Sequence, residues 1–519
     1  MTRSRMTDAV AGLLASAVAL AGGELAAGLS GGLSPVVAVA DIVVDYAPGG
    51  LVKAAIDALG TRDKPALLIT VTLVSLAIGA LLGPAAGRNR RVGLLAFVAF
   101  GVVGALASAR DPLSASMIAL AIAAAAAGSG LVALSLLLAA ASPETASAPA
   151  AMPGQGVVDR RRFLLFAAGA GGAATFALAG RELLGPRVDV EAERAAITLP
   201  PLAERFRDVP DLAVEGSSSL VTPNADFYRI DTALVVPRVA VEPWRLRITG
   251  LVDRPYELTF AELLGMASVE QSLTLSCVSN EVGGDLVGNA VWLGVPLTEI
   301  LERARVQDGA TQIVGRSVDG FTAGFPTEVA FDGHPAIVAI GMNGEPLPAI
   351  HGFPARLVVP GLYGYVSATK WIAEIELTTL EAFDAYWIPR GWAKEAPVKT
   401  QSRIDVPRHG RTIEAGRAAI AGVAWAGIRS VSRVEVRIHA AYGAPGDAPT
   451  EWREARLGEA LSQGSWRQWV YEWDATPGEY RIEVRAIDGE GATQTGERRP
   501  PAPDGATGHH AVRVTVRPA

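Results

Sequence analysis

Cys277 stands out as a residue that could do chemistry, because it is the only cysteine among 519 residues. It ends the apolar, alternating run SLTLSC (272–277) and precedes the polar, glycine-containing loop VSNEVGGD (278–285). A strand that ends here would place the sulfur where a loop exposes it to a ligand. A lone cysteine also rules out an intramolecular disulfide.

Three interpretations of Cys277 fit its surroundings. A single cysteine is more often a small buried hydrophobic residue than a reactive group. A thiol nucleophile needs a histidine base, which His351 in AIHGFPARLVVPG (349–361) could supply. A thiolate is also a preferred ligand of soft redox metals. These residues alone leave all three open.

The elements around Cys277 predict a mixed α+β domain over residues 197–395, after a polar linker at 186–196. WRLRITGLVDRPYELTF (244–260) is typical of a hairpin around Asp253. Thr259 and Glu262 have the spacing of a capping box for the next helix. KWIAEIELTT (370–379) alternates as a half-buried strand does, with Ala373 and Ile375 on one face and Ile372 and Glu374 on the other.

Residues 396–519 predict an all-β domain. VSRVEVRIHA (431–440), YRIEVRAID (480–488) and AVRVTVRPA (511–519) each place β-branched residues on one face. We expect Trp466, Trp469 and Trp473 to fill the core of a sandwich. No catalytic cluster occurs there, so a packing or dimerisation module is the better interpretation.

Five motifs together resemble the sulfite oxidase family. They are NADFYRID (224–231), LSCVSNEVGG (275–284), WLGVPL (292–297), HGFPARLVVPGLYGYVSATKWI (351–372) and RGW (390–392). The stretch 222–407 resembles the molybdopterin-binding domain of that family. The residues after it resemble the family's immunoglobulin-like dimerisation domain.

The resemblance implies a molybdenum-molybdopterin cofactor, with Cys277 as the one protein thiolate on the metal beside the two dithiolene sulfurs. The pterin phosphate is a dianion that needs charge-assisted donors. The family's phosphate and pterin contacts are matched by Arg356, Lys370 and the backbone of Ala368 and Thr369. Positions that hydrogen-bond the pterin or line the approach to the metal are matched by Tyr228, Arg229, Asp319 and His351.

The sequence departs from the family near the metal. Sulfite oxidases carry a C-x-G-N-R-R pattern, whereas Cys277 is followed by VSNE (278–281). A doubly charged anion such as sulfite binds best where fixed, positively charged side chains lie in the site. The tyrosine that faces the metal in those enzymes has no clear equivalent. Arg229 is therefore the one arginine expected to contact an anionic substrate, and we expect it to be catalytic alongside Cys277.

Residues 1–185 are dominated by Ala, Leu, Val and Gly, and predict a membrane domain of about five transmembrane helices. The apolar runs cover about 9–29, 66–87, 92–109, 116–141 and 163–184, and 34–60 is expected to be interfacial or re-entrant. The basic clusters, including RNRR (88–91) and Arg160 to Arg162, all fall on one side of these runs. Because basic residues stay cytoplasmic, everything after 185 is expected outside the cytoplasmic membrane.

The fifth run begins with RRRFL (160–164), which fits the core of a twin-arginine export signal. We expect this segment to be both anchor and signal, because a cofactor-loaded domain must cross the membrane folded. The same run spells G-x-G-x-x-A from Gly169 to Ala174, with Asp189 twenty residues after Gly169. A basic cluster rather than a strand precedes it, which argues against a dinucleotide site.

The complete prediction is a multi-domain oxidoreductase: an α-helical membrane bundle, an α+β molybdopterin domain and an all-β immunoglobulin-like sandwich. Expected partners are a small-molecule substrate, an external one-electron redox protein, the membrane, and a second copy bound through the C-terminal domain. A net charge of −7 argues against nucleic acid, and the lack of histidine before His334 argues against a bis-histidine haem among the helices. The alternatives are a cysteine-dependent hydrolase using Cys277 and His351, or a non-catalytic surface binding protein.

Overall fold

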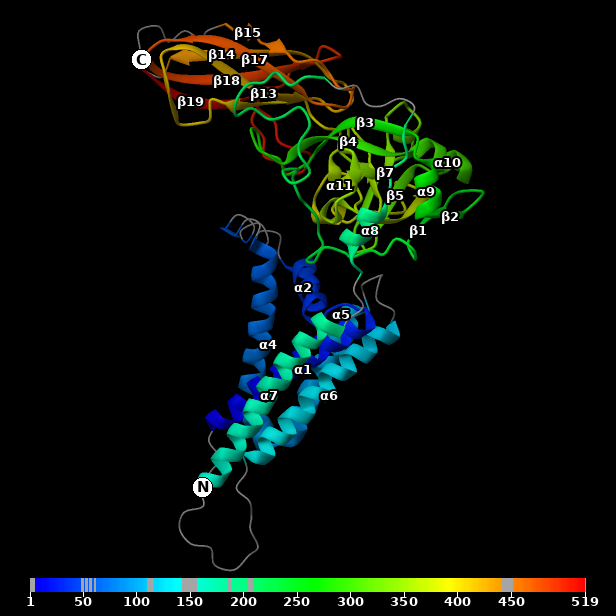
Figure 1. Ribbon diagram of the computed structural model, residues 1–519, viewed down its shortest axis with the longest axis vertical. Helices are drawn as coiled ribbons and strands as arrows, with labels where there is room; N and C mark the ends of the chain where they lie inside the picture. Colours follow the sequence, from blue (N-terminus) through cyan, green and yellow to red (C-terminus); the bar gives the residue numbers. More distant parts are fainter. Residues whose placement is uncertain are drawn as a thin grey trace, which may run out of the picture. The chain divides into compact units, whose positions relative to one another are not determined.

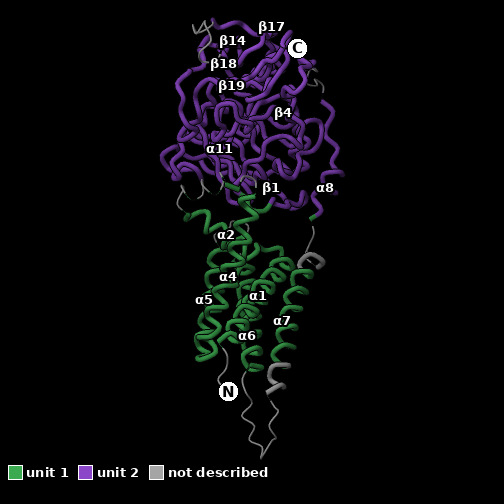
Figure 2. The backbone as a smooth tube through the Cα atoms, turned by 90° about the vertical axis from the view of Figure 1, so that its left-hand side faces the viewer, with its two compact units in different colours: residues 1–188, 233–235 green, residues 189–232, 236–519 purple. Residues whose placement is uncertain are grey.

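The computed structural model of the chain contains two compact units (Figure 2). One comprises residues 1–188 and 233–235, and the other comprises residues 189–232 and 236–519. The structure describes residues 5–47, 51, 55, 58–59, 62–109, 116–141, 156–184, 188–202, 209–440 and 451–518. The boundary expected near residue 395 lies inside the second unit and stays a prediction.

Long apolar helices dominate the first unit. They are α1 (Arg5–Ser30), α4 (Asp63–Arg88), α5 (Arg90–Ser108), α6 (Ser116–Ala140) and α7 (Gly156–Leu184). By length and composition these five are able to cross a membrane, and they coincide with the five predicted apolar runs. The helix α7 continues through Gly169 and Ala174, so these residues do not form the turn that a dinucleotide loop requires.

Helix packing in this unit depends on small residues. α1 packs against α4, α6 and α7 (Figure 1). A Cβ atom on Gly12 of α1 would lie 2.1 Å from the carbonyl oxygen of Gly79 of α4, so only glycine permits this approach. The short helix α2 (Pro35–Tyr46) follows Ser34, whose hydroxyl accepts a hydrogen bond from the backbone N of Val37 at 3.3 Å. Most of the remaining 34–60 segment lies outside the described residues.

Two sheets carry the α+β part of the second unit. The first has the order β2-β1-β10-β5-β6, and the second has the order β3-β4-β7-β8, with β9 paired to β7. Their strands are β1 (Arg245–Gly250), β2 (Tyr256–Thr259), β3 (Val269–Ser276), β4 (Val287–Pro296), β5 (Gln312–Ser317), β6 (Thr322–Pro326), β7 (Ile337–Met342), β8 (Glu345–Pro346), β9 (Arg356–Val358) and β10 (Ile372–Thr378). The helices are α8 (Val190–Ala196), α9 (Phe260–Met266), α10 (Leu297–Ala304) and α11 (Gly364–Ser367).

Local sequence signals explain several of these elements. β1 and β2 form the predicted antiparallel hairpin around Asp253. The predicted capping box is confirmed, because Thr259 and Glu262 exchange side-chain and backbone hydrogen bonds at the start of α9. One face assignment in β10 is wrong. A register shift between Ile372 and Glu374 lets both Ile372 and Ile375 enter the core, despite the expected alternation.

The C-terminal part is β-rich and has a core of its own. One sheet has the order β11-β13-β17-β16, and the other has the order β12-β19-β18-β14-β15. The strands are β11 (Gln401–Val406), β12 (Arg411–Glu414), β13 (Gly416–Trp425), β14 (Val431–Ala440), β15 (Arg453–Glu454), β16 (Arg456–Leu457), β17 (Arg467–Ala475), β18 (Gly478–Asp488) and β19 (His510–Arg517).

Two of the three tryptophans expected in the C-terminal core are there, and one is not. Trp469 and Trp473 pack in this core. Trp466 belongs to the core of the α+β part instead. It precedes β17, and its indole N–H donates to the carbonyl oxygen of Leu220 at 2.8 Å. Because Trp466 precedes β17, the inward–outward alternation of that strand does not determine the direction of its side chain. The prediction for Trp466 was wrong for this reason.

Candidate active site

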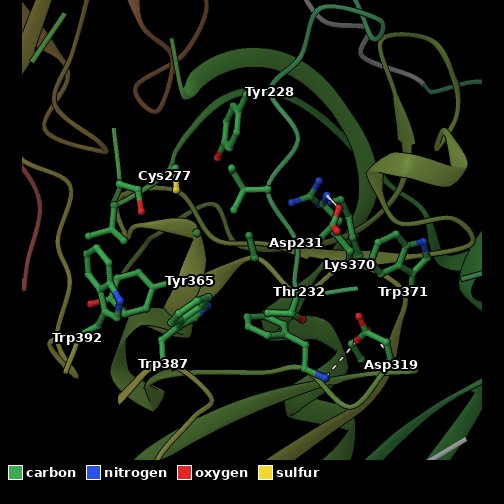
Figure 3. Close-up of a pocket in the computed structure, with 18 of the residues that line it drawn as sticks. Tyr228, Asp231, Thr232, Cys277, Asp319, Tyr365, Lys370, Trp371, Trp387 and Trp392 are labelled. Atoms are coloured by element: carbon green, nitrogen blue, oxygen red, sulfur yellow. Dashed lines mark hydrogen bonds and ion pairs between the residues drawn. The ribbon is translucent and has the colours of Figure 1, made fainter. Parts of the chain in front are cut away.

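A pocket lies beside Cys277, where segments from both sheets of the α+β part meet (Figure 3). β3 ends at Ser276, so Cys277 is the first residue after the strand, as predicted. The backbone N of Cys277 donates to the carbonyl oxygen of Leu286, and its own carbonyl accepts from the N of Asn280 at 3.1 Å. The tight turn therefore holds the cysteine at the pocket wall.

Burial favours the protonated thiol form of Cys277. The residue is 8% exposed, and burial raises the pKa of its thiol, although hydrogen bonds from Ser279 partly oppose the rise. A buried thiolate without a cation beside it is costly. The sulfur is therefore suited to a positively charged partner rather than to free nucleophilic attack.

His351 is poorly placed to activate Cys277. It does not line the pocket, and no hydrogen bond joins the two side chains within the described part of the chain. The His351 Nε2–H donates to the carbonyl oxygen of Asn224 at 2.9 Å, and burial lowers its pKa to about 4. So weak a base argues against the cysteine hydrolase.

A buried ion pair forms the opposite wall. The Lys370 Nζ lies 3.1 Å from the Asp231 Oδ2 and also donates to the carbonyl oxygen of Ile350. Burial lowers the pKa of Lys370 to about 8, even though Asp231 acts in the other direction. Asp231 lies in the motif NADFYRID but was not singled out as a site residue from the sequence.

Arg356 lies deeper, in β9. Its Nη1 donates to the carbonyl oxygen of His351 at 3.1 Å, and its guanidinium stacks over the ring of Trp292 at 4.9 Å. Burial lowers its pKa to about 10. The Arg356 Nε and the His351 Nδ1 are both buried without a hydrogen-bond partner in the described structure. One is a donor in need of an acceptor, and the other is an acceptor in the tautomer whose Nε2 donates.

The other predicted residues divide into two groups. Tyr228, Asp319 and Ala368 line the pocket. Burial raises the pKa of both the Tyr228 phenol and the Asp319 carboxyl. Thr369 is buried but is not part of the lining, and the Ala368 amide already donates to Gly364. Arg229 also lies outside the lining, and its Nε pairs with the Asp231 Oδ2 at 3.0 Å.

Seven aromatic side chains line the pocket, and four of them are here called the aromatic rim: Phe321, Tyr365, Trp387 and Trp392. Tyr365, Trp387 and Trp392 lie on the Cys277 side in the view of Figure 3, whereas Asp231 and Lys370 lie on the other. The Tyr365 and Trp392 rings are 5.8 Å apart, and the Tyr365 hydroxyl donates to the carbonyl oxygen of Ala393. Sequence reasoning missed Tyr365 and Trp387, although FDAYWIPRGW (383–392) is unusually aromatic.

Comparison with known proteins decides the family. Residues 233–387 match the family model described as oxidoreductase molybdopterin binding domain. The uncharacterized oxidoreductase YuiH of Bacillus subtilis (strain 168) is 34% identical over 149 residues, which are 29% of this chain and 72% of that protein. The chain belongs to the molybdopterin-binding oxidoreductase family.

Other similar proteins extend the match beyond the pocket. Mitochondrial sulfite oxidase from Homo sapiens is 27% identical over 351 residues, covering 58% of this chain. The chain spans 60% of the length of that enzyme. The crystal structure of the sulfane dehydrogenase SoxCD from Paracoccus pantotrophus covers 64% of this chain and 93% of its own, with 22% identity and a TM-score of 0.48.

The molybdopterin cofactor that this family implies fits the pocket. Among the described residues, no group of three or more His, Cys, Asp or Glu side chains is placed to hold a metal ion. Arg356 lines the pocket, and its unpartnered Nε calls for an acceptor such as a phosphate oxygen. Molybdopterin carries a phosphate.

Proposed function

We propose that this protein is a membrane-anchored molybdenum oxidoreductase that transfers an oxygen atom to or from a small substrate. One observation carries the proposal: the pocket combines a lone buried cysteine with Arg356 and Lys370 in a chain of the molybdopterin-binding family. Cys277 would ligate the metal. The bound molybdenum centre would supply the two-electron oxygen-atom chemistry, while the chain binds, orients and excludes water.

The cofactor-binding roles follow from charge and exposure. Arg356 and Lys370 supply the buried positive charge for the phosphate, and Tyr228, Asp319, His351, Ala368 and Thr369 contact or support the pterin. Arg229 pairs with Asp231, which itself pairs with Lys370. We assign Arg229 to holding this network, in place of the substrate contact that the sequence suggested.

The aromatic rim favours an uncharged substrate. Both cations in the pocket lining, Arg356 and Lys370, are assigned to the cofactor phosphate, and Lys370 is also paired with Asp231. Aromatic faces bind apolar substituents well but do not neutralise a dianion such as sulfite. A small neutral molecule that carries or accepts one oxygen atom fits these walls better.

The remaining parts of the proposal concern location and partners. The five apolar helices would anchor the protein in the cytoplasmic membrane, with the catalytic domain outside. An external one-electron redox protein would exchange electrons with the site. The β-rich C-terminal part would be an immunoglobulin-like sandwich that supports a homodimer, as the family resemblance suggests.

Metal analysis tests the central claim. The full chain, purified in detergent from a cofactor-producing host, should contain about one molybdenum per chain. Cys277→Ser should keep the fold and much of the bound pterin but lose turnover in parallel assays of sulfite oxidation and sulfoxide reduction. A metal-free protein, or full activity in Cys277→Ser, would contradict the proposal.

Export through the twin-arginine route has a separate test. Replacing Arg160 and Arg161 by Lys keeps the charge but removes the guanidinium pair that the signal needs. The catalytic domain should then remain cytoplasmic, as protease accessibility in spheroplasts would reveal. Normal export of this variant would contradict the signal assignment and leave the catalytic proposal untouched.

A further inference from the structure

A pocket between α5 and α6 combines two arginines with leucine side chains. Arg90, Arg91 and Leu94 of α5 line one side, and Leu131, Ser135 and Leu138 of α6 line the other. All belong to the helical unit, and α5 packs against α6 there. The catalytic pocket shares none of these residues.

The arginines of this pocket have no ionic partner in the described structure. Arg90 and Arg91 are both exposed, and the first turn of α5 contains no acidic residue. The salt bridges among the described residues do not include Arg90 or Arg91. Two uncompensated positive charges in one pocket are suited to an anion that accepts from both guanidinium groups.

The apolar side chains continue from this charged end. Leu94 follows Arg90 and Arg91 by about one helical turn, so it lies on the same face of α5. Leu131, Ser135 and Leu138 are spaced by four and three residues, which places them in one stripe along α6. The pocket is therefore charged at one end and apolar along its length, as an amphiphile is.

We propose that this pocket binds an anionic phospholipid, with its phosphate at Arg90 and Arg91 and one acyl chain along the leucines. The inference rests on the membrane insertion proposed above. A soluble anion would use only the arginines, and an uncharged lipid would use only the leucines. Cytoplasmic retention of basic residues explains why Arg88, Arg90 and Arg91 cluster where α4 ends and α5 begins. It does not explain why two of them line a pocket with leucines.

Arg88 provides a matched control, because it is exposed, lies in the same turn and does not line the pocket. The full chain, in nanodiscs of phosphatidylcholine, is titrated with phosphatidylglycerol, and bound lipid is counted by native mass spectrometry. Each arginine near an anionic lipid contributes about 1 kcal/mol, or roughly fivefold in affinity. Arg90→Ala and Arg91→Ala should each weaken binding about fivefold, whereas Arg88→Ala should change it less than twofold.

Two further arms identify the ligand. Phosphatidylcholine with the same acyl chains should bind at least tenfold more weakly, and inorganic phosphate should not displace the lipid. Equal weakening by Arg88→Ala would show diffuse attraction and overturn the site. Full displacement by phosphate would show a soluble-anion site, and equal binding of phosphatidylcholine would show an uncharged-lipid site; either result overturns the proposal. Carbonate extraction of native membranes separately tests whether the chain is inserted at all.

Discussion

Lys370 and Asp231 form an ion pair of 3.1 Å in the wall of the pocket beside Cys277, although they lie 139 residues apart in the chain. Their side chains are only 10% and 5% exposed. A buried charge is tolerated when its partner compensates it, and removing one partner leaves the other uncompensated. The pair thus joins the segment NADFYRID (224–231) to the segment 368–370, which precedes β10 and carries predicted phosphate and pterin contacts.

Asp231→Asn should destabilise the protein markedly. The lysine would lose its carboxylate inside the fold, and breaking such a pair costs about 3–5 kcal/mol. Denaturant unfolding of the cofactor-free protein would measure this loss. The pKa of Lys370 should also fall further below about 8, because Asp231 now raises it.

An ion pair that is more exposed to solvent provides the comparison. Arg247 and Glu374 lie 2.9 Å apart, with side chains 52% and 17% exposed. Glu374→Gln should cost at most about 1 kcal/mol, because water screens such pairs. Equal costs for Asp231→Asn and Glu374→Gln would show that the pocket pair is not specially buried.

Stability should fall with acidity partly because of His351. Its pKa of about 4 in the fold lies below the ordinary 6.5, so between these values the unfolded chain binds a proton that the fold does not. The contribution is complete above pH 6.5 and is lost as the pH falls towards 4, by up to about 3 kcal/mol.

Unfolding at pH 7 and pH 5 checks this sign. His351→Gln should reduce the drop in unfolding free energy between the two pH values, and carboxylates that titrate in the same range cancel in the comparison. Burial also lowers the pKa of His510 to about 4. His510→Gln should therefore also reduce the drop in unfolding free energy between pH 7 and pH 5. An unchanged pH dependence in both variants would contradict burial as the cause.

The sequence predicted features whose signals are local. The capping box of Thr259 and the end of β3 before Cys277 depend on neighbouring residues alone. The order of the family motifs also predicted that Tyr228, Arg356 and Lys370 share one site, and all three line the pocket beside Cys277. Each of these features is marked either by residues close together in the sequence or by a distinctive family motif.

Features that depend on long-range packing were missed. Asp231 meets Lys370 only because the fold closes a long loop, and no local pattern marks the partner. Trp387 lies in an irregular segment, where hydrophobic periodicity predicts nothing about direction. Trp466 packs in the core of the α+β part rather than in the expected C-terminal core, because it precedes β17 and does not follow the alternation of that strand.

Gly283 should tolerate no side chain, because the turn after Cys277 packs against His510. Its φ is +82°, and an added Cβ would lie 2.3 Å from the His510 Cδ2. Gly344 has the same φ of +82°, but no atom lies within 4 Å of the place of its Cβ. Alanine at either site costs about 1–2 kcal/mol for the backbone, and only Gly283→Ala adds about 1–3 kcal/mol for the clash. Melting temperatures of the two variants should differ accordingly; equal values would contradict the close packing.

Trp387 should contribute to substrate affinity rather than to the chemical step. Its ring lines the pocket beside Cys277, and an aromatic contact of this kind contributes about 0.5–1.5 kcal/mol. Trp387→Ala should therefore raise KM for a methyl aryl sulfoxide about 2- to 12-fold with little change in kcat, and Trp387→Phe should recover most of the loss. Steady-state kinetics with a reduced dye as electron donor would measure both constants.

Trp452 is the control for this prediction, because it lies in the C-terminal part, where its ring contacts the guanidinium groups of Arg437 and Arg485. Trp452→Ala should leave KM unchanged even if it lowers the melting temperature. A fall in kcat with unchanged KM in Trp387→Ala would mean that the rim acts only in the transition state, since uniform binding affects KM alone. Faster turnover of sulfite than of any uncharged substrate would contradict the assignment of the rim, because both cations in the described lining, Arg356 and Lys370, are assigned to the cofactor phosphate.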